Sequence, residues 1–468
     1  MLDYLDPTNL LSILMGPLGR EYLSQAGKRR PITIKLNPLK ANPANILSFL
    51  HEEGFLLRPL PHYDLAYEVE HEPYPLTKSI IHFAGLIYLQ DPSSMLPPIL
   101  LDPRPGEVVL DLTAAPGSKT TLLSTLMENK GAVVAIDNSG KRLQALSYNL
   151  ERWGVINTGW GRGLAEQIGN IFFECFDKVL VDPPCTGLGT LHKSPEILRW
   201  WKGSKVIKLS RIQERILISG LKALKPRGTL VYSTCTLTPH ENEGVVNAIL
   251  ERYPVVLEEI KIKNIPTHPG LVEFINFRFN KELSKAIRIY PLEQEGEGFF
   301  VAKLKKMEAF SPPRYKSLPQ EQTFFLPTDL QIKERIEEIK RHFGLKEDPF
   351  PHTAFFLLKR HARIASIELA GLSSPIPLQR GLSFAHTLKG GWRLTTRGIQ
   401  WLAPIISKNF IELDSKSLRT LLSGHTLCEV SGHGQQLLTH LGCPLGYGLI
   451  KDGQLISQIP SKELIIRE

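Results

Sequence analysis

The sequence predicts an α/β fold whose core is a buried parallel sheet, with an N-terminal α+β extension and a C-terminal β-rich module on either side. Two observations predict the core. Between about residues 91 and 306, apolar runs alternate with amphipathic helical stretches, and the pattern changes at both ends of this region. Such alternation is typical of βαβ units, in which helices cover both faces of a parallel sheet.

The first 90 residues are predicted to form the α+β extension. Residues 31–36 alternate polar and apolar side chains, as a half-exposed strand does. Residues 44–53 have a helical pattern that stops at Gly54. Several prolines then break residues 59–75 into loops.

Four apolar runs are predicted to be the strands of the core, at residues 108–112, 132–137, 176–181 and 228–233. Helical stretches at residues 119–127 and 141–153 follow the first two runs. The core is therefore expected to span residues 91–306.

The region after the core is predicted to hold a connector, residues 307–375, and the β-rich module, residues 376–468. Proline and polar residues at 307–325 indicate a linker, and residues 329–343 form an amphipathic helix that ends at Gly344. Short strand-like runs, such as 424–430 and 446–450, follow between glycines and prolines.

Composition narrows the class of protein. The chain has 468 residues, of which 42% are hydrophobic, an ordinary globular balance that excludes a disordered or fibrous protein. No apolar run reaches the ~20 residues of a membrane span, and the start of the chain has no basic residue before Arg20, so neither a membrane partner nor a signal peptide is expected. The net charge of +9 indicates a polyanionic partner.

The five cysteines lie far apart, without the CxxC pairs or Cys/His clusters of a zinc site. A disulfide framework and a bound metal are therefore not expected, and a reducing cytoplasm is the predicted location. For Cys175, Cys428 and Cys443 the sequence favours a role as small hydrophobic residues.

A turn after the first predicted strand is the candidate cofactor site. Small side chains there allow a ligand to approach the backbone, and the following helix N-terminus favours an anionic group. The order Gly-Ser-Lys-Thr excludes a Walker A loop, and the dinucleotide pattern is absent. Asp137 ends the next strand, where a carboxylate can bind ribose hydroxyls. A nucleoside cofactor without pyrophosphate fits, and S-adenosylmethionine is predicted. The turn consists of Thr113, Ala114, Ala115, Pro116, Gly117, Ser118 and Lys119.

Two cysteines follow the third and fourth predicted strands. Cys185 lies in the segment Asp182-Pro183-Pro184-Cys185, and Cys235 follows Ser233-Thr234. Because ligands bind beyond the carboxyl ends of parallel strands, both thiols are expected at the ligand-binding edge. The Asp-Pro-Pro turn resembles that of amino-methyltransferases, but a cysteine stands where those enzymes have an aromatic residue.

Paired thiols suit methylation of carbon 5 of a pyrimidine. A thiolate that adds to carbon 6 makes carbon 5 nucleophilic toward a methylsulfonium, and the carbon 5 proton and the thiol leave afterwards. A carboxylate near ring nitrogen 3 stabilises the adduct. The attacking cysteine is expected to have a pKa below the free value of ~8.5.

These motifs, with Leu-Gln-Asp-Pro-Ser-Ser-Met at residues 89–95 and the run at 224–235, resemble the NOL1/NOP2/Sun family of RNA cytosine-5 methyltransferases. The resemblance covers about residues 28–306. It implies a Rossmann-like class I methyltransferase with an N-terminal RNA-binding extension. It also implies that Cys235 attacks carbon 6, Cys185 aids product release, and Asp182 contacts the base beside the methyl donor. The loop from Thr113 to Lys119 and Asp137 would hold S-adenosylmethionine, and Lys119 would contact its carboxylate or the base.

The C-terminal region resembles, more loosely, a bacterial ribosomal-RNA subgroup of the RsmF kind, which implies a PUA-like module at residues 376–468. One departure concerns the cofactor: the family places an aspartate near the adenine, and residues 157–176 contain none. Glu166 or backbone groups are the two alternatives. Smaller departures are Thr113, Ser118, Pro184 and Thr186.

RNA is the predicted partner, with phosphate contacts expected from basic clusters at residues 28–30, 303–306, 314–316 and 359–363. Ribosomal RNA, free or in the small ribosomal subunit, is the predicted substrate and transfer RNA the alternative. A third alternative is an RNA-binding protein that assists ribosome assembly without catalysis. A monomer is expected.

Overall fold

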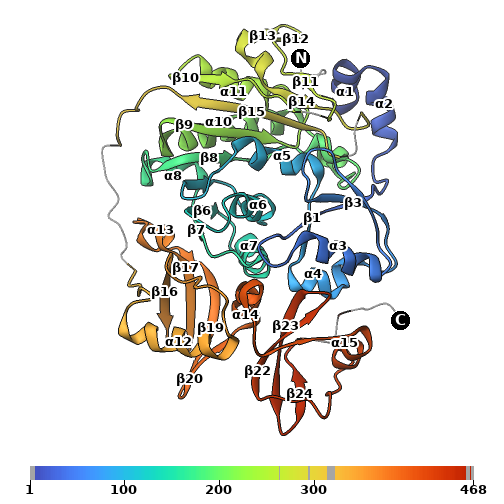
Figure 1. Cartoon of the computed structure of the whole chain (residues 1–468). Helices are drawn as coiled ribbons and strands as arrows, with labels where there is room; N and C mark the ends of the chain where they lie inside the picture. Colours follow the sequence, from blue (N-terminus) through green and yellow to red (C-terminus); the bar gives the residue numbers. More distant parts are fainter. Residues whose placement is uncertain (1–5, 263, 294–295, 314–321, 460–463, 465–468) are drawn as a thin grey trace.

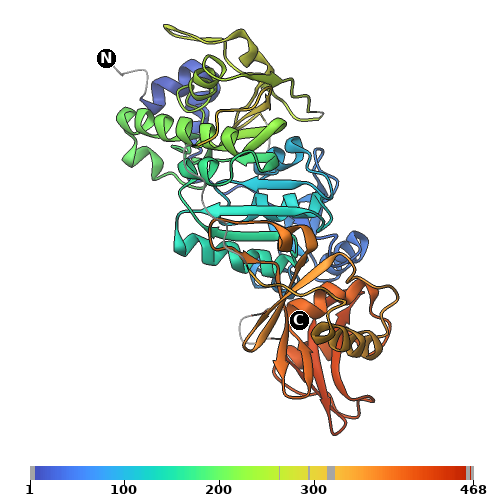
Figure 2. The same cartoon turned by 90° about the vertical axis from the view of Figure 1, so that its left-hand side faces the viewer.

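The computed structural model describes the chain except for residues 1–5, 263, 294–295, 314–321, 460–463 and 465–468. A large central sheet lies beside an N-terminal extension, and two smaller C-terminal sheets lie below them, the second of them packed against the extension (Figure 1). Seen from the side, the molecule is elongated, with the C-terminal sheets at one end and helices α1 (Pro7–Met15) and α2 (Pro17–Ser24) near the other (Figure 2). None of the helices in the described part of the chain has both the length and the apolar character that a membrane span requires.

The central sheet has ten strands, and its main path runs β11-β14-β15-β9-β8-β5-β6-β7-β18, with β10 paired to β15. The inner strands β9, β8, β5 and β6 pair in parallel, as predicted, β7 is a further parallel strand that was not predicted, and their neighbour β15 is antiparallel. The parallel strands are β5 Val108–Asp111, β6 Ala132–Asp137, β7 Thr158–Arg162, β8 Phe176–Val181 and β9 Leu224–Thr234. The remaining strands are β10 Val255–Glu258, β11 His268–Pro269, β14 Ile287–Ile289, β15 Phe299–Lys306 and β18 Gln379–Arg380.

Helices cover both faces of this sheet because alternate apolar residues of each strand point to opposite sides. Leu110 and Val134 pack in the core cluster that contains residues of α8, α10 and α11, whereas Val109 and Val133 pack with residues of α5 and α6. These helices are α5 Pro92–Leu101, α6 Ser118–Leu126, α8 Ala165–Ile171, α10 Gly203–Ala223 and α11 Glu243–Leu250. Helix α7, Gly140–Trp153, also packs against α6 and β7.

The N-terminal extension is an antiparallel sheet of order β2-β3-β1-β4 with helices α3 and α4. The predicted strand and helix are confirmed as β1 and α3, whereas residues 59–75, expected to be loops, contain strand β3, which pairs with β1 and β2. Asn42 begins α3, because its side chain accepts a hydrogen bond from the Ala44 N–H. The elements are β1 Ile32–Leu36, α3 Pro43–Glu52, β2 Leu56–Pro59, β3 Ala66–His71, α4 Ile80–Ala84 and β4 Ile87–Leu89.

The C-terminal region forms two four-stranded sheets. The first contains β16 Thr353–Leu358, β17 His361–Ser366, β19 Leu382–Leu388 and β20 Gly391–Leu394, and helix α12, Leu330–Phe343, packs on it as predicted. The second contains β21 Phe410–Glu412, β22 Gly434–His440, β23 Cys443–Lys451 and β24 Gln454–Ser457. Helices α13 Ile367–Gly371, α14 Thr396–Leu402 and α15 Ser415–Leu422 complete the region.

Two expectations for this region differ from the structure. The boundary predicted at residue 376 falls inside the first sheet, because β16 and β17 precede it and form a hairpin whose turn is Lys359-Arg360. The strand predicted at 424–430 is wrong: this segment has only a single bridge, Leu427 with Leu455. The hairpin was missed because its polar turn interrupts an apolar segment. The strand at 424–430 was predicted because apolar residues are scattered through that segment. The PUA-like identity of the module stays a prediction.

Buried polar contacts hold the N-terminal extension and the C-terminal sheets against the core through α7. The Lys40 ammonium donates to the Ala84 and Arg152 carbonyls, each at 2.7 Å, and to the Gln400 side chain at 2.9 Å. Arg363 on β17 pairs with Glu151 on α7 at 2.7 Å. The three parts of the chain therefore share contacts on one helix.

Candidate active site

The loops after β8 and β9 bring the two predicted thiols together. The sulfur atoms of Cys185 and Cys235 lie 3.3 Å apart, and both residues are partly buried. The two strands are adjacent and parallel, so their carboxyl ends meet at one edge of the sheet. The predicted juxtaposition is confirmed.

Asp182 lies at the same edge with both carboxylate oxygens engaged. The Lys119 ammonium donates to Oδ2 at 2.7 Å, and the Ser233 hydroxyl donates to Oδ1 at 2.8 Å. Lys119 also donates to the Ser94 hydroxyl at 3.0 Å. Burial alone would lower the pKa of Lys119, but the Asp182 carboxylate raises that pKa above its ordinary value. Lys119 therefore keeps its proton, and its hydrogen bond with Asp182 fixes both side chains beside the thiols.

The expectation of a low thiol pKa is wrong for Cys235 in this structure. Its hydrogen bond with Cys185 stabilises the protonated form, and burial together with nearby negative charge acts in the same direction, so the pKa of Cys235 lies well above its ordinary value. The sequence showed the two cysteines at one edge but not their contact. The thiol must therefore lose its proton during the reaction.

Glu241, which the sequence analysis did not single out, binds the two cysteine loops to each other. Its buried carboxylate accepts hydrogen bonds from the Thr186 N–H and hydroxyl, the Gln213 amide and the Thr238 hydroxyl. Gln213 donates at the same time to the Pro184 carbonyl at 2.9 Å. Burial raises the pKa of Glu241. This carboxyl, positioned between residues that flank Cys185 and Cys235, maintains the distance between the thiols.

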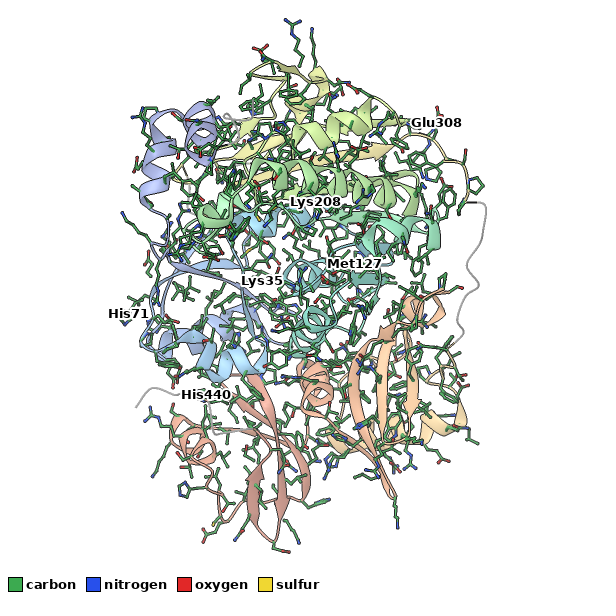
Figure 3. The ribbon with its side chains drawn as sticks, turned by 180° about the vertical axis from the view of Figure 1, so that it is seen from behind. Lys35, His71, Met127, Lys208, Glu308 and His440 are labelled. Atoms are coloured by element: carbon green, nitrogen blue, oxygen red, sulfur yellow. The ribbon has the colours of Figure 1, made fainter. Side chains whose placement is uncertain are left out.

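The predicted cofactor turn connects β5 to the N-terminus of α6. Gly117 has φ +106°, and a Cβ there would lie 2.8 Å from Leu146, so glycine is required. Thr121 donates to the Gly117 carbonyl as the first helical hydrogen bond, so the N–H groups before it have no acceptor within the helix. The Lys35 ammonium supports this turn from the N-terminal extension, where it donates to the Ser118 carbonyl at 2.7 Å (Figure 3). The turn offers N–H groups suited to an anionic group.

Asp137 ends β6 beside this turn. Its oxygens accept from the Ser139 N–H at 2.9 Å and the Ala115 N–H at 3.3 Å, and Arg142 lies 3.4 Å away. These contacts hold the carboxylate at the sheet edge, where ribose hydroxyls can reach it. Together, the helix N-terminus and this carboxylate fit a nucleoside cofactor with an anionic group.

Glu166 lies in the first turn of α8, directly after β7, and is partly buried. It is thus at the same edge as Asp137, since β6 and β7 are parallel neighbours. The alternatives for the adenine contact, Glu166 or backbone groups, stay open.

Replacing Asp137 by alanine should weaken cofactor binding about 10- to 100-fold, because a hydrogen bond to a charged group contributes ~1.5–3 kcal/mol. Isothermal titration calorimetry with S-adenosylmethionine measures this. The matched control is Asp177→Ala at the opposite end of β8, where the carboxylate pairs with Lys225. Equal affinity in the wild type and the Asp137 variant would contradict the assignment.

A second cluster lies beside the site and joins α5 to the loop before β15. Ligand atoms of Asp91, His192 and Glu297 lie within 4.8 Å of one another, close enough to share a cation. The Lys193 ammonium is the cation present there, and it lies 2.6 Å from Glu297 and 3.5 Å from Asp91. Burial raises the pKa of Glu297 to about 7. The ammonium thus balances carboxylates that would otherwise repel each other.

Asp91, His192 and Lys193 of this cluster line a cavity of about 1200 Å³ between the N-terminal extension and the core. Arg29 and Arg30, from the first predicted basic cluster, line it as well. The cluster at 303–306 differs from expectation: Lys306 is buried against Glu174, and Lys303 lies 3.5 Å from Glu258. In the cluster at 359–363, Arg363 is engaged by Glu151. The predicted residues Arg314 and Lys316 lie outside the described residues.

Comparisons with known proteins match this architecture. A sequence profile of the family described as 16S rRNA methyltransferase RsmB/F matches residues 98–305. Ribosomal RNA small subunit methyltransferase F of Shewanella piezotolerans is 31% identical over 91% of this chain and 89% of its own length. The tRNA (cytosine(49)-C(5))-methyltransferase of Pyrococcus abyssi is 38% identical over 58% of this chain and 88% of its own length.

Among solved structures, a methyltransferase homologue from Pyrococcus horikoshii is 35% identical with a TM-score of 0.58. It covers 65% of this chain and 97% of its own chain. The predicted α/β methyltransferase fold is therefore confirmed.

Proposed function

The chain belongs to the RsmB/F family of 16S rRNA methyltransferases, and on this premise we propose that it methylates carbon 5 of a cytosine in RNA of the small ribosomal subunit. The enzyme is an S-adenosylmethionine-dependent RNA methyltransferase, and the resemblance to the NOL1/NOP2/Sun family holds. One observation carries the cytosine-5 chemistry: two thiols 3.3 Å apart stand beside an ionic Asp182–Lys119 pair.

In this proposal the Cys235 thiol first loses its proton to solvent, and the resulting thiolate adds to carbon 6 of the cytosine. The new S–C6 bond moves the ring π electrons to carbon 5, which then acts as a nucleophile. When bound, S-adenosylmethionine supplies an electrophilic methyl group on a sulfonium. After carbon 5 has accepted the methyl group, Cys185 takes part in removal of the carbon 5 proton. The C5–H electron pair re-forms the double bond as the S–C6 bond breaks, and Cys235 leaves as thiolate.

Asp182 and Lys119 orient the base in the proposal. Asp182 is held by Lys119 and Ser233, so its position does not change as the ring gains charge. The target cytosine must leave its stack to reach these groups, which favours unpaired RNA. Deprotonation of Cys235 is favoured by any positive charge brought into the pocket, because a nearby cation stabilises the thiolate.

The rate of adduct formation should rise with pH. Since the pKa of Cys235 is raised, the thiol predominates at neutral pH, and the thiolate fraction grows tenfold per pH unit below that pKa. We expect log(kcat/KM) to increase with a slope near +1 between about pH 6.5 and 8.5. In Cys185→Ala the hydrogen bond is lost, so the single-turnover profile should reach its plateau at lower pH. A flat wild-type profile would contradict this account.

The test of the function uses methyl-labelled S-adenosylmethionine with small-subunit ribosomal RNA and with transfer RNA, followed by nucleoside analysis. We expect 5-methylcytidine in ribosomal RNA. Transfer to tRNA alone would change the substrate class and leave the chemistry intact. Failure of both cofactor binding and methyl transfer would favour the non-catalytic alternative. Whether the substrate is naked RNA or an assembled subunit, the monomeric state and the cytoplasmic location stay predictions.

A further inference from the structure

Helices α9, Ile197–Trp200, and α10 present an unusually basic surface next to the proposed active site. Six cations lie between residues 199 and 215, and the only carboxylate in that range is Glu214, which pairs with Arg252. We call these six residues the basic face: Arg199, Lys202, Lys205, Lys208, Arg211 and Arg215. All six are exposed, and none of them has a carboxylate partner among the described residues.

Helical periodicity places the last four of these cations on one side of α10. Lys205, Lys208, Arg211 and Arg215 are three, three and four residues apart, the spacing of neighbours on a helix surface. Figure 3 locates Lys208 on this helix, which crosses the upper half of that view. The opposite side is apolar and packs on the sheet through Ile216, Leu217 and Leu221. Like charges repel at this spacing, so their grouping lowers stability unless a polyanion binds there.

The basic face is rigidly connected to the catalytic loops. Gln213, on the buried side of α10, donates to the Pro184 carbonyl and to Glu241, each at 2.9 Å. The loop before α9 also forms a wall of the large cavity, with His192 and Lys193. Gly27 in the N-terminal extension donates to the Leu191 carbonyl at 3.0 Å, which joins this wall to Arg29 and Arg30. Cationic groups therefore extend from this cavity onto α10.

An aromatic ring accompanies the cations. Trp200 is exposed, and the Lys205 ammonium lies 3.4 Å from its ring centroid. Exposed aromatic rings beside cations are typical of surfaces that stack unpaired bases and neutralise phosphates. The cations fit any polyanion, and the exposed ring beside them favours single-stranded RNA over an acidic protein.

We propose that the basic face binds the phosphate backbone of the substrate RNA next to the target cytosine, with Trp200 stacking on an unpaired base. This inference rests on the proposed function for the identity of the RNA. It adds a binding surface that none of the predicted basic clusters includes.

The test is the triple variant Lys205→Glu/Lys208→Glu/Arg211→Glu, with RNA affinity measured by fluorescence anisotropy over a range of salt concentrations. Loss of three phosphate contacts should lower the slope of log Kd against log salt by about 2. We expect Kd to rise at least tenfold at ~0.1 M salt, KM for RNA to rise in parallel, and kcat at saturating RNA to stay unchanged. Trp200→Ala should weaken binding to single-stranded RNA about tenfold, since stacking contributes ~1–3 kcal/mol per base.

The matched control makes the same charge change at the opposite edge of the sheet: Arg104→Glu/Lys130→Glu/Arg227→Glu. These three exposed cations lie near the beginnings of β5, β6 and β9. Cofactor affinity by calorimetry shows that each variant is folded. Equal weakening by the two triple variants, or none by either, would overturn the proposal. Because binding is measured without methyl transfer, a wild-type protein that binds RNA but does not methylate it refutes the proposed function alone.

Discussion

Cys235→Ala should abolish methyl transfer, with a loss in kcat/KM of at least about 10³-fold. Alanine cannot add to carbon 6, so carbon 5 of the cytosine stays a weak nucleophile however well the base is held. The side chain is small and partly buried, so cofactor affinity and thermal stability should change little. Incorporation of labelled methyl groups into RNA measures the loss.

Cys175→Ala is the control for this variant. Cys175 lies just before β8, at the edge of the sheet opposite the site, and its sulfur contacts only the Phe173 carbonyl among the polar groups of the described chain. This variant should keep wild-type turnover. If Cys235→Ala also keeps it, another nucleophile carries the reaction and the covalent mechanism is wrong.

Cys185→Ala should trap the enzyme on its RNA. Without the second thiol, attack by Cys235 and methyl transfer still proceed once, whereas removal of the carbon 5 proton slows. Multiple-turnover activity should fall about 10²- to 10³-fold, while each enzyme molecule retains one methylated RNA through the S–C6 bond. A denaturing gel with labelled RNA measures this adduct as a slowly migrating band.

The double variant Cys185→Ala/Cys235→Ala separates this adduct from tight but non-covalent binding. It should give no slow band, because the attacking sulfur is gone. Full turnover of Cys185→Ala without an adduct would show that product release does not need this thiol. A slow band in the double variant would place the bond elsewhere on the chain.

Several parts of the molecule could be predicted from local sequence. Six elements of the core, four strands and two helices, follow from apolar runs and helical periodicity, because each buried strand or amphipathic helix carries its own pattern. Strand β7 does not: Thr158–Arg162 contains two glycines, and it is a strand because it pairs with β6 on one side and β18 on the other. This pairing depends on residues far away in the sequence, so the local pattern of β7 does not predict it.

The first C-terminal sheet gives the same lesson. The sequence pattern placed strands β16 and β17 in a connector with a basic cluster, because Lys359 and Arg360 interrupt the apolar pattern. In the structure these two residues form a hairpin turn. A turn needs polar residues for solvation, so the charges that suggested RNA contact have a structural reason.

The candidate site divides in a similar way. The residue types and their positions after strands established, from sequence, that Cys185, Cys235, Asp182 and Asp137 face one edge, because strand direction alone determines where the carboxyl ends meet. Glu241 and the basic face of α10 were missed. The basic face could have been predicted, because its cations are spaced three and four residues apart in the sequence.

By itself, then, the sequence determined the parallel core, the cofactor turn and the chemistry of two thiols, since these depend on periodicity and on residue type. Only the tertiary structure decided how far apart the sulfurs stand, why Cys235 holds its proton, and which cations remain free for RNA. Hydrogen bonds, burial and ion pairs depend on through-space distances between residues far apart in the chain. Lys306 and Lys208 look alike in sequence, yet one is buried against Glu174 and the other is exposed.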